Sequence, residues 1–188
     1  MWILNLHFNG SRDGGFLLPK GYNRGILDHD CYIVQEGVSW MSAEIKLSQS
    51  TAIRLEQARG KGMPEEEILK AIQAKDVSAF DAVSEEEYRY NEFFSYADEH
   101  GENLEAAVKD GYRITFNTRG GLGIWLEKAF KVQPERDFTV GEGIITGLQL
   151  KQEQAEVLAK RLASNWVITD SKDVPAGQEL TLKLRALV

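Results

Sequence analysis

The sequence predicts an α+β fold, with a mixed, largely antiparallel sheet and a cluster of helices from the middle of the chain packed on it. Strand patterns lie near both ends of the chain. Residues 2–8 and 179–187 alternate between apolar and polar side chains, which is typical of strands with one buried face. Helical patterns are concentrated between residues 48 and 110. This first part of the chain lacks the strict strand–helix alternation of doubly wound sheets.

Turn residues separate the strand patterns. Glu36 and Gly37 predict a hairpin turn, and Gly141, Gly143 and Gly147 interrupt a single strand pattern, where glycine indicates a bulge or a close approach. The strands at both ends and the hairpin near 31–47 favour antiparallel pairing. The expected strands cover residues 2–8, 31–35, 38–47, 112–116, 139–150, 166–170 and 179–187.

Capping residues and glycines delimit the expected helices. Ser48 or Ser50 is the N-cap of a helix that ends before Gly60, and Pro64 begins the next helix. Ser84 fits the first position of a capping box, which predicts a helix after it. The expected helices cover residues 48–59, 64–74, 85–100, 103–109 and 151–164.

The apolar faces of these elements predict the core. A buried leucine in the helix at 151–164 is expected to stabilise the fold strongly. The predicted core residues are Leu4, Leu6, Ile33, Ile45, Phe93, Ile114, Phe116, Leu158, Leu162, Leu182 and Leu184.

Length and composition favour a single domain over residues 1–188, with a weak possible seam near 76–83. The chain has 188 residues, of which 43% are hydrophobic, and this is enough for a core that folds unaided. The single cysteine, Cys31, excludes a disulfide within the chain and suits a reducing compartment. The strand-like N-terminus and the lack of a long apolar run predict a cytoplasmic protein that does not enter membranes.

The charge balance excludes one broad class of function. A net charge of −7 argues against direct nucleic-acid binding, because that affinity depends on lysine and arginine neutralising phosphates. Acidic residues crowd the segment that begins at Glu85, Glu86 and Glu87. A solvated helix surface with acid at its N-terminus is the favoured explanation of this crowding, and an inhibitor that mimics nucleic acid is the alternative.

The segment at 112–130 combines a strand, a glycine-rich turn and a possible helix start. If 122–130 is a helix, its free N–H groups, together with Arg119, Gly120 and Gly121, form an anion-binding site. Residues 122–126 also fit a second strand, which would make the turn an ordinary hairpin. The glycine-rich loop at 9–27 is then expected to close over the anion through Arg12, Lys20 or Arg24.

Few residues have the types and spacing that catalysis requires. Asp28, His29 and Asp30 are the best candidates for a general base, but a solvated turn explains them as well. The histidines lack the spacing of metal ligands, so no metal or other cofactor is expected. No catalytic signature identifies an enzyme.

The aromatic residues between 88 and 96 are too many for one helix face, which makes Tyr88 and Tyr96 candidates for contact with a protein partner. The sequence therefore favours a small binding or regulatory protein that acts through protein–protein contacts or self-association, without chemistry of its own. The first alternative is an enzyme or ligand-binding domain for a phosphate-bearing or other anionic small molecule, and the second is the acidic nucleic-acid mimic.

Overall fold

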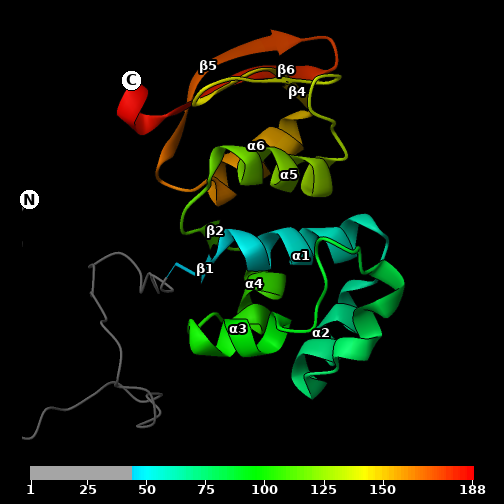
Figure 1. Ribbon diagram of the computed structural model, residues 1–188. Coiled ribbons are helices and arrows are strands. Elements are labelled where there is room, and N and C mark those ends of the chain that lie inside the picture. The colour runs from blue at the N-terminus through cyan, green and yellow to red at the C-terminus, as the bar shows by residue number, and fades with distance from the viewer. Residues whose placement is uncertain (1–43) are drawn as a thin grey trace, which may run out of the picture. The chain divides into compact units, whose positions relative to one another are not determined.

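The computed structural model describes residues 44–188, which form one unit of helices and sheets (Figure 1). The α+β class is confirmed, because helices accompany a four-stranded antiparallel sheet and a two-stranded parallel one. The predicted strands at 2–8 and 31–35, the loop at 9–27 and Cys31 lie outside the described residues.

Most predicted helices form close to their expected bounds. Each of α1, α4 and α5 begins after a side chain that accepts a backbone N–H of the first turn. No helix between residues 44 and 188 has the length and apolar character that crossing a bilayer requires. The helical elements are α1 Gln49–Gly60, α2 Glu65–Ala74, η1 Val77–Val83, α3 Phe93–Glu99, α4 Leu104–Asp110, α5 Arg119–Phe130, α6 Gln152–Arg161 and η2 Arg185–Leu187.

Two separate sheets organise the described part of the chain. The short strands β1 Lys46–Leu47 and β2 Arg113–Ile114 pair in parallel. The larger sheet is antiparallel, with the strand order β3-β4-β6-β5. Its strands are β3 Thr139–Val140, β4 Ile144–Leu150, β5 Trp166–Val174 and β6 Gly177–Leu184.

The prediction of a single strand at 139–150 is wrong, because these residues form a hairpin of β3 and β4. The chain reverses where Gly143 adopts a φ of +74°, and the Gly141 N–H donates to the Ile144 carbonyl at 2.8 Å. Gly147, with a φ of +71°, lies at a register shift between Ile145 and Leu148. The bulge that glycine indicated in this pattern is therefore present.

The helix predicted at 85–100 is wrong in its first half. Side chains of α1 bind carbonyl groups of this segment: Arg54 Nε donates to Arg89 O at 2.6 Å, and Gln57 Nε2 donates to Tyr88 O at 3.4 Å. These tertiary bonds take the place of helical ones, so only α3 remains helical. The aromatic ring of Tyr90 then stacks on Phe80 at a centroid distance of 4.5 Å.

Helix α5 lies near the centre of the core. Leu122, Trp125 and Leu126 are fully buried, and in Figure 1 α5 lies between α1 and the larger sheet. The predicted core residues that are buried are Phe93, Ile114, Leu158, Leu162 and Leu182; Ile45 and Leu184 are partly buried. Phe116 was predicted in the core and is instead 57% exposed.

Candidate functional site

Helices α1 and α5 lie side by side and run in the same direction. Each follows one strand of the parallel pair, and Gln49 in the first turn of α1 bonds to Thr118, the N-cap of α5. At the other end, a Cβ atom on Gly60 would come within 2.9 Å of Lys128 O, so glycine permits a close helix approach there. We call the end around Gln49 and Thr118 the N-terminal end of the pair, and the end around Gly60 and Lys128 the C-terminal end.

Side chains of the chain itself cap the N-terminal end. Ser48 Oγ accepts from the Thr51 N–H at 3.2 Å, and Thr118 Oγ1 accepts from the Gly121 N–H at 3.0 Å. Gln49 Oε1 accepts from the Thr118 N–H at 2.8 Å. A Cβ atom on Gly121 would overlap the Gln49 amide, so Gly121 is covered by that side chain.

Of the two alternatives left open for 122–130, the structure has the helix, and the three residues of the predicted anion site lie in different environments. Gly121 is buried, whereas Arg119 and Gly120 are exposed. Arg119 Nη1 is 3.9 Å from a Glu142 oxygen, but their side chains are 55% and 99% exposed, so this ion pair is weak. A Cβ atom on Gly120 would meet nothing within 4 Å, so a ligand can approach the backbone at this point.

Phe116 is exposed because the residue after it is held inside. Asn117 is fully buried, and its carbonyl accepts from Trp166 Nε1 at 3.0 Å and from Asn165 Nδ2 at 2.8 Å. The Asn117 side chain in turn accepts from the Ala163 N–H at 3.3 Å. Buried polar groups are costly unless they are bonded, and this network satisfies those of Asn117. The alternation of β2 therefore ends at Ile114, and Phe116 points to solvent.

Between the two ends, a buried carboxylate connects α1, α5 and α6. Glu56 Oε1 accepts from Arg161 at 2.6 Å, from the Tyr112 hydroxyl at 2.8 Å and from Arg59 at 3.0 Å. Trp125 Nε1 donates to the same hydroxyl at 3.0 Å. Burial, and then the charge of Glu56, raise the pKa of Tyr112 well above its ordinary value. Because these groups satisfy one another, the network is structural.

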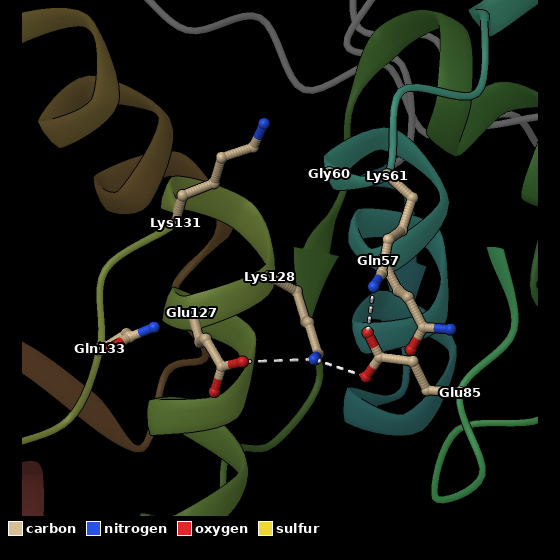
Figure 2. Close-up of a pocket in the computed structure, with 8 residues that line it drawn as sticks. All are labelled: Gln57, Gly60, Lys61, Glu85, Glu127, Lys128, Lys131 and Gln133. Carbon is tan, nitrogen blue, oxygen red and sulfur yellow. Dashed lines mark hydrogen bonds and ion pairs between the residues drawn. The ribbon is translucent and has the colours of Figure 1, made fainter.

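The C-terminal end of the pair holds a cavity of about 340 Å³ (Figure 2). Lys61 and Lys128 converge on the two oxygens of Glu85, at 3.0 and 2.8 Å, whereas Lys131 points away from that carboxylate. Lys128 also reaches Glu127 at 3.3 Å. The lining residues are Gln57, Gly60, Lys61, Glu85, Glu127, Lys128, Lys131 and Gln133.

The pKa values of Glu85 and Lys128 both shift in the direction that favours the charged side chain. Hydrogen bonds from Lys128 and then from Lys61 lower the pKa of Glu85 below its ordinary 4.5. Partial burial disfavours the Lys128 ammonium, but its bonds to Glu85 and Glu127 outweigh this effect and raise its pKa. By residue type, the lining comprises three lysines and two glutamates.

The remaining sequence-predicted residues are dispersed. Tyr88 is half-buried with the Lys128 ammonium 5.9 Å from its ring centroid, which places it near the C-terminal end of the pair. Tyr96 lies on α3, stacked on His100 at 4.0 Å. The candidate catalytic residues Asp28, His29 and Asp30 and the candidate ligand-binding residues Lys20 and Arg24 are outside the described residues.

Sequence reasoning missed the cavity at the C-terminal end. Lys61 and Lys131 each follow a helix, where a lysine is an ordinary partner for the helix dipole. Glu85 was read as part of an acidic helix face. Gly60 both ends α1 and permits the close approach of Lys128. A local sequence pattern cannot show this second role, because Lys128 is far from Gly60 in the chain.

Within residues 44–188 no three histidine, cysteine, aspartate or glutamate side chains gather in a way that suits a metal ion. No protein-family model, curated protein or solved structure matches the chain significantly. A function for the chain therefore rests on its own residues.

Proposed function

We propose that this chain is a binding protein that acts through protein–protein contacts, and that the loop between β2 and α5 carries the contact. The observation behind the proposal is the exposure of Phe116, which is 57% accessible beside the exposed Arg119. Aromatic residues and arginine are the side chains most enriched at the energetic centres of protein interfaces.

The backbone beside Phe116 favours an acidic partner. Thr118 occupies the N–H groups of Gly121 and Leu122 through its hydroxyl and its carbonyl. The N–H groups of Arg119 and Gly120, which come first in the helix, have no helical partner and are available to a carboxylate. An acidic segment with one apolar side chain would thus satisfy Phe116, Arg119 and the helix end together.

The hydrogen bonding of the buried polar groups supports binding over catalysis. The polar atoms of Glu56, Tyr112 and Asn117 form hydrogen bonds with other residues of the fold. A general base or nucleophile needs a free lone pair facing a substrate. The proposed partner is either a protein with an acidic segment or a second copy of this acidic chain.

The test compares the complete chain with three variants: Phe116→Ser, Arg119→Glu and, as the control, Tyr96→Ser. Tyr96 is a partly exposed aromatic on another helix that was itself a candidate for partner contact. Sedimentation velocity measures self-association, and quantitative affinity capture measures partners. We expect Phe116→Ser and Arg119→Glu to lose the complex with an unchanged circular dichroism spectrum, and Tyr96→Ser to retain it. A complex that survives the first two changes but not the third would move the contact to α3.

A further inference from the structure

One residue that lines the cavity at the C-terminal end of the helix pair has a buried acceptor without a hydrogen bond in the described part of the chain. Gln57 is 1% exposed and lines this cavity. Its Nε2 donates to Val83 O at 2.8 Å and to Tyr88 O at 3.4 Å, and these two carbonyls fix which way the amide faces. Its Oε1 is buried and accepts no hydrogen bond from any residue between 44 and 188.

An unbonded buried acceptor is uncommon, because it loses its hydrogen bond to water on folding and gains no hydrogen bond in exchange. The lysines alone have a simpler explanation. Lys61 and Lys131 are the C-caps of α1 and α5, where positive charge compensates the helix dipole. The dipole explains neither the unbonded oxygen of Gln57 nor the cavity that this residue lines.

We propose that this cavity binds a small anion that also carries a hydroxyl group, such as a hydroxycarboxylic acid or the phosphate ester of a polyol. The anionic group pairs with the ammonium groups of Lys61 and Lys131, and the hydroxyl donates to Gln57 Oε1.

The charges of the lining residues favour an anion. Three lysines face two glutamates, and both glutamates are already paired: Glu85 with Lys61 and Lys128, and Glu127 with Lys128. Lys131 forms no ion pair with a residue of the described part of the chain, so its charge is available. Its exposed, flexible side chain can turn toward a ligand.

The size of the cavity limits the ligand. At about 340 Å³ it lies near the lower end of the range for small-molecule sites, roughly 300–1,000 Å³. This excludes most cofactor-sized molecules and suits a compact acid. The site does not depend on the proposed protein contact, because it lies at the opposite end of the α1–α5 pair.

The experiment titrates the complete chain with malate, succinate and inorganic phosphate, using isothermal calorimetry. Malate and succinate differ by one hydroxyl group, so their ratio reports on Gln57 without altering the protein. A hydroxyl that satisfies a buried acceptor is expected to make malate bind about tenfold more tightly than succinate, equivalent to about 1.4 kcal/mol. Phosphate measures the contribution of charge alone.

The matched variants are Lys131→Gln and Lys61→Gln in the cavity, with Lys172→Gln as the control. Lys172 is an exposed lysine on β5 with a side chain that is 67% accessible. We expect the two cavity variants to bind malate about tenfold more weakly, as loss of a charge-assisted bond implies, and Lys172→Gln to bind as the wild type does. Absence of saturable malate binding would overturn the proposal. So would equal affinity for malate and succinate, or equal weakening by all three variants, because each of these results indicates unspecific ionic attraction.

Discussion

The two ends of the α1–α5 pair compensate the helix dipoles with different groups. A helix dipole favours negative groups at its start and positive groups at its end. At the N-terminal end the chain supplies neutral caps and Gln49, together with a carboxylate, since Glu102 Oε1 accepts from the Ser48 N–H at 2.5 Å. At the C-terminal end it supplies lysines around a cavity, and Glu85 bridges two of them, Lys61 and Lys128.

This difference shows that the dipole alone does not create a site at either end. The N-terminal end is closed by amides and hydroxyls, and what it offers outward is an exposed aromatic ring, an arginine and two backbone donors. The C-terminal end holds a cavity lined by charged side chains, and one of its lining residues, Gln57, has a buried oxygen without a hydrogen bond in the described part of the chain. We therefore infer that the first end suits a macromolecular partner and the second a small molecule.

The change with the largest expected effect removes the buried carboxylate of Glu56, which joins α1 to α6 and, through the Tyr112 hydroxyl, to Trp125 of α5. Glu56→Ala leaves Arg161 and Arg59 without the oxygen they share. Removing one partner of a buried ion pair usually costs about 3–5 kcal/mol, and we expect a loss of that size. Urea denaturation, followed by the fluorescence of the buried Trp125 and Trp166, measures it. A loss below about 1 kcal/mol, as for an ordinary surface change, would show that the network is not what fixes α6 on α1.

A substitution at one end of the pair should cost less stability, and a matched substitution at the other end provides its control. Gly60→Ala places a methyl group 2.9 Å from the backbone oxygen of Lys128, which cannot rotate away. Overpacking of this kind typically costs about 1–3 kcal/mol. The control is Gly120→Ala, where a methyl group meets nothing within 4 Å and helix propensity alone predicts a gain of up to about 1 kcal/mol. If thermal denaturation ranks the two variants in the opposite order, the close approach at Gly60 is wrong.

The N-caps at the N-terminal end should contribute less to the free energy of unfolding than Glu56 and Gly60 do. Thr118→Ala removes the acceptor of the Gly121 N–H and one contact of Gln49, and a lost N-cap costs about 1 kcal/mol. Ser48→Ala is the matched variant at the start of α1, where the Thr51 N–H loses its acceptor. Chemical denaturation of both proteins checks the prediction. A destabilisation confined to Ser48→Ala would indicate that Gln49 alone is sufficient to close α5.

The smallest effect concerns the pH dependence of the C-terminal end. The pKa of Glu85 is lower in the folded chain than its ordinary 4.5, so the carboxylate stabilises the fold above pH 4.5 and this contribution disappears as the pH falls through the folded value. Because the Glu85 side chain is 30% exposed, we expect less than about 1 kcal/mol. Glu85→Gln should therefore lower the unfolding free energy at pH 7 and leave it close to that of the wild type in strong acid. An equal difference at both pH values would contradict the role of its charge.

Local chemistry made much of this fold predictable. Ser48 marks the start of α1, and Asn103 caps α4 through a bond to the Ala106 N–H at 2.9 Å. The helix at 119–130 could not be distinguished from a strand, because its apolar spacing fits both and only the buried positions of Trp125 and Leu126 decide.

The features that sequence reasoning missed depend on distant residues. Phe116 faces solvent because Trp166, 49 residues beyond Asn117, binds the Asn117 carbonyl. Segment 84–92 is not helical because Arg54 and Gln57 bind its carbonyl groups from α1. The candidate sites likewise join residues far apart in the chain, and periodicity carries no information about such pairs.

The separation of the two ends has one direct test, a nuclear magnetic resonance titration of the ¹⁵N-labelled complete chain with malate. Glycine amides are convenient reporters, since Gly60 belongs to the C-terminal end and Gly120 to the N-terminal end. We predict that the Gly60 resonance shifts and saturates, while the Gly120 resonance does not move. A saturating shift at Gly120 with none at Gly60 would place the small anion at the start of α5 and contradict the division of roles between the two ends.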